Sequence, residues 1–313
     1  MEKNKQTVFL MPAFKDYLWG GTRLKTEYNK KTELDKVAES WELSTHKDGE
    51  SVIRSGKYAG EKLSEYIQKN PYDVLGKRAK AFDFFPILIK FIDAKQSLSV
   101  QVHPDDEYSL AKNGEYGKTE MWYILDCDDG AELYYGFRDK ITKEEFRQSI
   151  ENNTLLEKLN SVKVKKGDVY FIEAGTVHAI GKGIVICEIQ QNSNTTYRVY
   201  DYNRKDANGN TRELHIEQAL EVAKTEPAKN YQSTGNILAK CKYFTVEKAT
   251  VNGKSSFEIS DECFKSAIVV NGEGKIEMED FTADIKKGDS IFIPAQNGVF
   301  KIFGDCELII SYV

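Results

Sequence analysis

Short runs of alternating apolar and polar residues recur along most of the chain and predict a mainly β protein. Such runs, rich in aromatic and β-branched residues, are typical of strands with one buried face. They span residues 85–92, 98–102, 121–125, 132–137, 183–190, 244–250, 267–270 and 308–313. Because the runs are short and are separated by turn residues, they favour a β-barrel or a sandwich.

Helical patterns are fewer than strand patterns. Thr142 followed by Glu145 forms a capping-box signature ahead of an apolar run. Residues 214–223 place their apolar side chains at helical spacing. We expect both helices to pack against the β core. The polar stretch 226–235, which contains Pro227, is the expected linker to the rest of the chain.

A ten-residue pattern occurs twice and indicates an internal repeat. The sequences KKGDVYFIEA at residues 165–174 and KKGDSIFIPA at residues 286–295 are separated by a constant offset of 121 residues. Each copy combines a Gly-Asp turn with an alternating strand. Two copies of one β-module explain the match most simply. We therefore expect two domains, at residues 1–228 and 229–313.

The composition excludes several classes of protein. The 313 residues contain 44 Lys and Arg against 49 Asp and Glu, so a formal net charge of −5 gives no overall attraction to nucleic acid. No stretch approaches the ~18 apolar residues of a membrane span. The apolar run 8–11 is cut by Pro12 before it reaches signal-peptide length. The five cysteines are scattered without a C-x-x-C pair. We expect reduced cysteines in a cytoplasmic protein that binds neither nucleic acid nor membrane.

The first copy of the repeat leads into a candidate metal ligand. It continues to Gly175 and His178 with the spacing G-x5-P-x-G-x2-H, except that Glu173 replaces the proline. This resembles the second motif of the cupin barrels. In the second copy the glycine and histidine positions hold Gln296 and Val299. The resemblance implies two jelly-roll β-barrel modules, of which the C-terminal one lacks a metal site.

Residues upstream of the repeat supply further candidate ligands. Residues two apart on a strand project from one face, so Gln101 and His103 point together. Glu120 opens the next predicted strand and adds a carboxylate to His178. Two imidazoles and a carboxylate with room for water or substrate are typical of a catalytic zinc site, although ligand preference alone leaves iron, manganese and cobalt open. The Gln101 amide is a weak ligand, and its alternative role is a hydrogen bond beside the metal.

Several segments along most of the chain carry a more specific resemblance. They are SVQVHPD at 99–105, KTEMW at 118–122, GTVHA at 175–179, YLWGG at 17–21, AESW at 38–41, TH at 45–46 and EIQQNSNTTYRVYD at 188–201. Together they resemble the zinc-dependent type I mannose-6-phosphate isomerases in their short bacterial form. The resemblance implies aldose–ketose isomerisation of mannose 6-phosphate and fructose 6-phosphate through an enediol, with one Zn²⁺ per chain. A small sugar phosphate is then the partner, and a monomer or homodimer is expected.

The resemblance also implies catalytic roles. Arg198 is expected to stabilise the enediolate, because its guanidinium is always charged. Glu188 is the first choice for the proton-transfer base, since its position is similar to that of a carboxylate near the family's site. Lys118 and His46 are the other titratable candidates. The choice among them depends on pKa values that the folded environment sets.

Substrate contacts follow from the same matching segments. Ser99 and Lys118 are expected to hold the phosphate, because each lies two residues before a candidate metal ligand and would share its face of a strand. Their alternatives are an ordinary strand serine and a solvated lysine. Trp19, Glu39 and His46 are expected to contact the sugar phosphate as well.

Two other functions are compatible with a cupin sequence. One is a bicupin that binds a sugar phosphate without turnover, although a metal site combined with Lys118 and Arg198 is more than binding alone needs. The other is a metal-dependent oxygenase of the cupin group. The first motif argues against it, because Gln101 stands where such enzymes have the first histidine of His-x-His.

Overall fold

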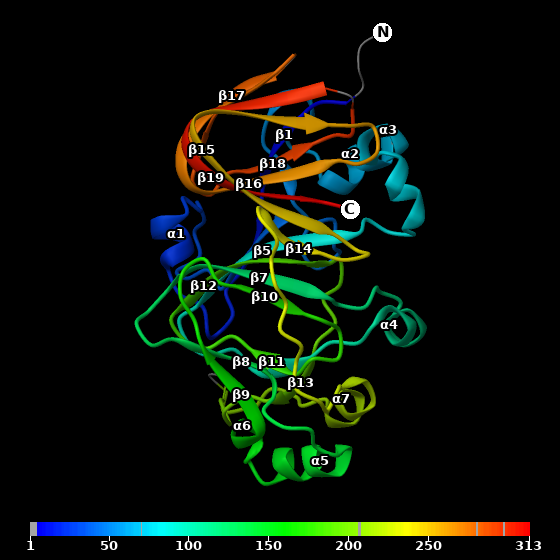
Figure 1. Cartoon of the computed structure of the whole chain (residues 1–313), viewed down its shortest axis with the longest axis vertical. Helices are drawn as coiled ribbons and strands as arrows, with labels where there is room; N and C mark the ends of the chain where they lie inside the picture. Colours follow the sequence, from blue (N-terminus) through cyan, green and yellow to red (C-terminus); the bar gives the residue numbers. More distant parts are fainter. Residues whose placement is uncertain (1–4, 70, 206–207, 280, 297) are drawn as a thin grey trace.

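A computed structural model describes residues 5–69, 71–205, 208–279, 281–296 and 298–313. Two β modules lie end to end along the long axis of the molecule, and the helices lie at its periphery (Figure 1). Strands outnumber helices and carry most of the core, which confirms the predicted mainly β fold. No helix among the described residues is long and apolar enough to cross a membrane.

The lower module in Figure 1 contains two antiparallel sheets that face each other. The six-stranded sheet has the order β10 (Val169–Ile172), β7 (Glu120–Cys127), β12 (Ile184–Gln191), β5 (Ile87–Ala94), β3 (Glu39–Leu43) and β2 (Ala13–Lys15). The five-stranded sheet has the order β13 (Tyr197–Tyr200), β6 (Val100–Val102), β11 (His178–Ala179), β8 (Glu132–Phe137) and β9 (Leu159–Lys163). Ile92, Trp122 and Ile186 from the first sheet pack with Leu133 and Tyr135 from the second. The two sheets thus enclose a barrel interior.

The upper module is one eight-stranded antiparallel sheet. Its order is β14 (Ile237–Lys240), β15 (Thr245–Ile259), β19 (Gly298–Tyr312), β16 (Lys265–Met278), β18 (Ser290–Ile293), β1 (Val8–Met11) and β4 (Val52–Ile53), and β17 (Phe281–Lys286) pairs with β16. The N-terminal strand β1 lies antiparallel to β18, with Val8 opposite Phe292. The start of the chain therefore completes the sheet of the C-terminal module, across the boundary expected at residue 228.

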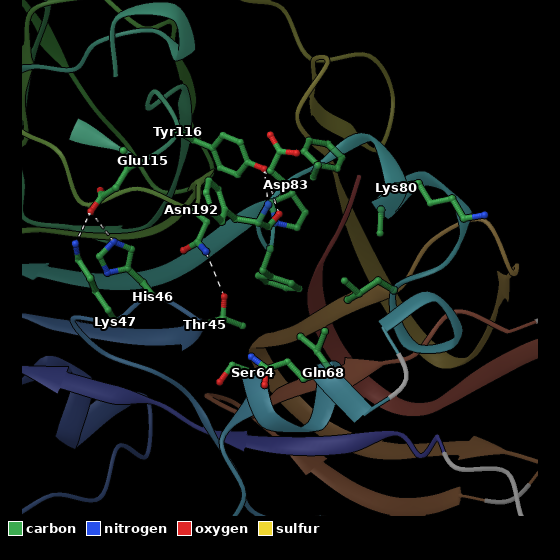
Figure 2. Close-up of a pocket in the computed structure, with 18 residues that line it drawn as sticks. Thr45, His46, Lys47, Ser64, Gln68, Lys80, Asp83, Glu115, Tyr116 and Asn192 are labelled. Carbon is green, nitrogen blue, oxygen red and sulfur yellow. Dashed lines mark hydrogen bonds and ion pairs between the residues drawn. The ribbon is translucent and has the colours of Figure 1, made fainter. Parts of the chain in front are cut away.

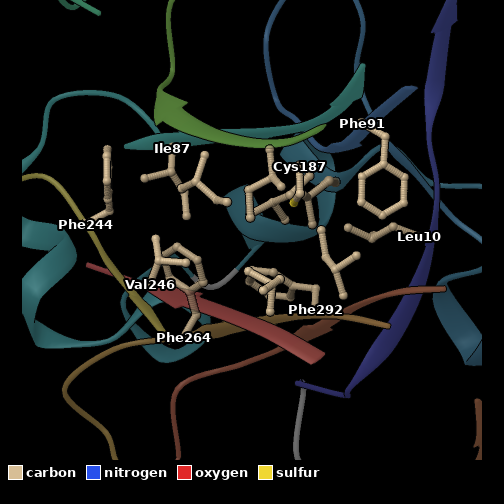
Figure 3. Close-up of a cluster of buried hydrophobic side chains, with 14 of the residues drawn as sticks. Leu10, Ile87, Phe91, Cys187, Phe244, Val246, Phe264 and Phe292 are labelled. Carbon is tan, nitrogen blue, oxygen red and sulfur yellow. The ribbon is translucent and has the colours of Figure 1, made fainter. Parts of the chain in front are cut away.

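A shared apolar layer joins the two modules (Figure 3). Ile87, Phe91 and Cys187 from the six-stranded sheet pack with Phe264 and Phe292 from the upper module. Alternate residues of a strand face opposite sides of its sheet. The remaining residues of β5, β7 and β12 therefore point into the barrel. This alternation directs Lys90, Glu120 and Glu188 to the barrel interior.

The sequence repeat is a structural repeat. β18 begins and ends 121 residues after β10, which is the offset of the sequence repeat. Gly167 and Gly288 both have φ of 92° in the turn before the strand. In each turn the following aspartate accepts a hydrogen bond of 2.9 Å from a backbone N–H three residues before it, Lys165 in one copy and Lys286 in the other. The two modules thus build this turn in the same way.

The two turn glycines give a matched stability prediction. Gly167→Ala is expected to cost about 1–2 kcal/mol, because positive φ disfavours any Cβ. Gly288→Ala is expected to cost about 1–3 kcal/mol more, since its Cβ would lie 1.9 Å from the Tyr28 carbonyl oxygen, whereas nothing lies within 4 Å at Gly167. Urea unfolding of the two variants measures the difference. Equal losses would show that the contact with Tyr28 relaxes at no cost.

In the part of the chain that the structure describes, seven α-helices surround the sheets. They are α1 (Arg23–Glu27), α2 (Leu63–Lys69), α3 (Pro71–Leu75), α4 (Asp106–Asn113), α5 (Lys143–Glu151), α6 (Leu155–Lys158) and α7 (Ile216–Val222), and two 3₁₀ helices span Gly56–Tyr58 and Lys77–Ala81. The capping box predicted at Thr142 and Glu145 is present at the start of α5. α7 begins two residues later than the expected range, because His215 is its N-cap. All five cysteines are free thiols.

Candidate functional site

A cavity of about 390 Å³ opens in the barrel and is lined from both of its sheets. Lys90 and Glu188 come from the six-stranded sheet, on the face that alternation turns inward. Gln101 and Arg198 come from β6 and β13 of the opposite sheet, where they are paired directly across the ladder. Lys118, just before β7, completes the inner wall. The fold thus concentrates charged side chains in an enclosed space.

Three of the predicted metal ligands meet next to this cavity. His103 follows β6, Glu120 begins β7 and His178 begins β11, and one ligand atom of each lies within 4.8 Å of the others. Glu120 Oε1 is 3.2 Å from His178 Nε2, and Glu120 Oε2 is 3.7 Å from His103 Nε2. Gln101 lies opposite His178 in the β6–β11 ladder, with its Nε2 atom 3.4 Å from His178 Nε2. All four predicted ligands are therefore neighbours.

Backbone carbonyls set the orientation of both imidazoles. His103 Nδ1 is 2.9 Å from the Thr195 carbonyl oxygen, and His178 Nδ1 is 2.9 Å from the Thr176 carbonyl oxygen. A carbonyl only accepts hydrogen bonds, so each Nδ1 carries the proton and each Nε2 presents its lone pair to the cluster. Burial lowers the pKa of His178 to about 4 and takes the pKa of His103 well below its ordinary value, which keeps both rings neutral. Neutral imidazoles held in this way are the form that binds a metal.

The donor set fits a cation. His103 Nε2 and Glu120 Oε1 are buried without a hydrogen bond, and the Glu120 carboxylate faces the Nε2 lone pairs of both imidazoles. Burial raises the pKa of Glu120 to about 8. A divalent cation between these atoms would satisfy the lone pairs and favour the ionised carboxylate. The described residues contain no second group of three such side chains.

Two carboxylates and two lysines alternate beside the cluster. Lys118 Nζ is 3.0 Å from Glu120 Oε2 and 4.0 Å from Glu188 Oε1, and Lys90 Nζ is 3.7 Å from the same Glu188 oxygen. Burial opposes ionisation of Glu188, but Lys118 and Lys90 hold its pKa below the usual value. Burial also opposes the charged form of Lys118, but Glu120 and Glu188 raise its pKa overall. Trp122 Nε1 donates to Glu188 Oε2 at 2.9 Å, and Glu188 Oε1 is buried without a hydrogen bond.

The family of the chain follows from comparison with known proteins. Residues 8–134 match the family described as phosphomannose isomerase type I, catalytic domain, and residues 234–313 match the mannose-6-phosphate isomerase, cupin domain. The chain is 40% identical to mannose-6-phosphate isomerase ManA of Bacillus subtilis, over 98% of this chain and 99% of that protein. The chain belongs to the type I phosphomannose isomerase family.

Further relatives cover the chain just as fully. A mannose-6-phosphate isomerase of Streptococcus mutans is 37% identical over 98% of both chains. The crystal structure of the mannose 6-phosphate isomerase from Bacillus subtilis superposes with a TM-score of 0.89 at 37% identity, over 99% of this chain and 100% of that one. The isomerase-family fold therefore includes both β modules.

Two arginine side chains, Arg198 and Arg212, also line the cavity of this phosphomannose isomerase family member. Arg198 Nε donates to Ser99 Oγ at 3.2 Å, and its Nη1 donates to the Glu213 carbonyl at 3.0 Å. Arg212 lines the same cavity and donates two hydrogen bonds, of 2.7 and 2.6 Å, to the Asp201 carboxylate. Sequence reasoning missed Arg212, because it lies in an irregular segment where no periodicity marks it.

Other predicted site residues fall into two groups. Trp19 and Glu39 line the cavity. His46 does not; it lies in a neighbouring, larger pocket of about 820 Å³, with Nε2 3.4 Å from Glu115 Oε1 (Figure 2). Lys90 was not predicted as a site residue. Its position inside the apolar run ILIKFIDA was the available signal, because a lysine within a buried strand indicates a charged interior site.

Proposed function

We propose that the protein interconverts mannose 6-phosphate and fructose 6-phosphate in the barrel cavity, with one zinc ion per chain. The observation that carries this proposal is the buried cluster of His103, Glu120 and His178 beside a Glu188 carboxylate oxygen that makes no hydrogen bond. A metal site next to an ionised carboxylate supplies the two needs of aldose–ketose isomerisation, which are charge stabilisation on oxygen and proton transfer at carbon.

The zinc would be held by His103, Glu120 and His178. Two imidazoles and one carboxylate match the preferences of catalytic zinc, and Gln101 is near enough to complete the set or to donate a hydrogen bond beside it. When bound, the ion would act as a Lewis acid that polarises the substrate carbonyl and stabilises negative charge on the sugar oxygens. The chain's own residues must then bind the open-chain sugar, orient C1 and C2, and move the proton.

Glu188 is the proposed proton-transfer base. Its Oε1 atom is buried in the cavity wall and makes no hydrogen bond, while Trp122 fixes the other oxygen. Its pKa is below the usual value, so the carboxylate is ionised at neutral pH and ready to accept a proton from the carbon beside the carbonyl. The same oxygen can return the proton to the neighbouring carbon. Lys118, 4.0 Å from this oxygen, would stabilise charge as the proton moves.

The phosphate would lie towards Ser99, Arg198 and Arg212. Arg198 and Arg212 bring two guanidinium groups to this end of the cavity, and Asp201 holds Arg212 in place. Lys118, by contrast, is paired with the candidate metal ligand Glu120, so we propose that it contacts the sugar end of the substrate. Arg198 faces the cavity beside Ser99 and would also stabilise the enediolate.

The test follows conversion directly. Purified protein loaded with zinc is incubated with mannose 6-phosphate, and fructose 6-phosphate is followed by NMR. We expect interconversion to equilibrium from either sugar. Tight binding without conversion would instead favour a sugar-phosphate-binding protein, and oxygen uptake would favour an oxygenase. Free cysteines are consistent with our expectation of a cytoplasmic enzyme, and we propose a monomer or homodimer as the active form.

A further inference from the structure

The loop at residues 192–196 joins β12 to β13 and reaches both the metal cluster and the cavity. The Thr195 carbonyl accepts a hydrogen bond from His103 Nδ1. Asn194 and Thr196 line the cavity on either side of it. The loop has neither helix nor strand of its own, so its conformation depends on contacts from elsewhere in the chain.

One carboxylate oxygen makes three of these contacts, and Thr45, Asp48 and Pro86 hold the side chains and backbone of Asn192 and Asn194. Glu115 Oε2 accepts from the Asn194 backbone N–H at 3.1 Å, from Ser193 Oγ at 3.4 Å and from Thr195 Oγ1 at 3.4 Å. Donors from three consecutive residues thus converge on a single atom. This arrangement fixes the local path of the loop, because moving any one of the three residues breaks a hydrogen bond to a charged acceptor.

The other oxygen of Glu115 is held from the opposite side. Glu115 Oε1 lies 3.4 Å from both His46 Nε2 and Lys47 Nζ, on the wall of the larger pocket (Figure 2). Burial opposes ionisation of Glu115, but the Asn194 N–H and the neighbouring His46 and Lys47 keep its pKa below the usual value. The carboxylate therefore stays charged and connects the segment after β3 to the loop. Glu115 itself does not line the cavity.

We propose that Glu115 is a positioning residue for the metal site. By holding residues 193–195 it keeps the Thr195 carbonyl against His103 Nδ1, and this keeps His103 Nε2 directed at the cluster. The inference rests on the proposed function, because it assumes that His103 is a metal ligand. It goes beyond that function by assigning a role in metal retention to a residue that contacts neither metal nor substrate.

The test measures metal release from the holoprotein. Wild type and Glu115→Gln are loaded with Co²⁺, and the loss of the cobalt absorption spectrum is timed after addition of excess chelator. Glu115→Gln keeps the size of the side chain but removes its charge. We expect release to become about tenfold faster or more, with a changed cobalt spectrum before release begins. Glu107→Gln, an exposed glutamate in α4, makes the same charge change and is expected to match wild type.

A second, less disruptive variant keeps the test valid if Glu115→Gln misfolds. Thr195→Val removes the hydroxyl that bonds Glu115 but leaves the Thr195 carbonyl in the chain, and we expect an intermediate release rate. If Glu115→Gln and Thr195→Val show the same release rates and spectra as Glu107→Gln, the inference is wrong while the proposed function stands. A wild type that neither binds Co²⁺ at this site nor isomerises sugar phosphate would overturn both.

Discussion

Replacing His178 with alanine is expected to remove the bound metal and to lower isomerisation by about 10³-fold or more, since Lewis-acid stabilisation is worth several kcal/mol. His178 is fully buried, its Nδ1 proton is held by Thr176, and its Nε2 atom faces the Glu120 carboxylate. The remaining His103 and Glu120 would leave a metal with too few ligands to hold it. Metal content by mass spectrometry and turnover by NMR measure the two effects on the same sample.

The comparison for His178→Ala is wild type freed of metal by chelation. Both proteins should have similar activity, and added zinc should restore the wild type alone. Because alanine leaves a cavity that itself destabilises the core, His178→Gln serves as a second variant with more of the volume retained. If either variant has activity near that of the zinc-loaded wild type, His178 is not a ligand of the catalytic metal.

Glu188→Gln is expected to lower kcat by about 10²- to 10⁴-fold while the metal content stays unchanged. The amide oxygen can still accept the hydrogen bond from Trp122, so the geometry of the side chain is retained. What is lost is the ionised oxygen that Lys90 and Lys118 keep deprotonated. Exchange of the C2 proton of mannose 6-phosphate with D2O should fall together with kcat.

Glu39→Gln is the matched control for Glu188. Glu39 lines the same cavity, accepts a hydrogen bond from Trp41 Nε1 at 2.7 Å and lies 3.5 Å from Lys90. It therefore has nearly the same surroundings, and we expect its substitution to change KM more than kcat. A larger loss of kcat in Glu39→Gln than in Glu188→Gln would show that Glu39, and not Glu188, is the proton-transfer base.

The fold could be predicted where a short apolar or alternating run is bounded by turn residues. The repeated turn and strand at 165–174 and 286–295 became β10 and β18, and the runs at 121–125 and 183–190 became β7 and β12. The long strands β15, β16 and β19 were predicted only in part. The middle of β15 is mostly exposed, so it lacks the apolar alternation that marks a strand. β1 pairs with β18 through residues such as Val8 and Phe292, which are 284 positions apart, and no local sequence pattern predicts such a contact.

The proximity of the candidate metal ligands could be predicted from strand alternation and from the motif spacing. Gln101, His103, Glu120 and His178 meet because each lies at or next to the end of an interior-facing strand. His46 follows the end of β3, beyond the barrel wall, so nothing in the sequence showed that it would face Glu115 instead of the cavity. Arg212 and Glu115 lie in irregular segments. Their positions depend on hydrogen bonds to Asp201 and to residues 193–195, which only the folded chain brings together.

A zinc titration of the metal-free protein tests the central claim most directly. Metal is removed by chelation, zinc is added back in fractions of one equivalent, and the rate of fructose 6-phosphate formation is measured at each step. The account predicts a linear rise that ends at one zinc per chain, and no rise in His178→Ala. Full activity in the metal-free protein, or an equal response in His178→Ala, would contradict it.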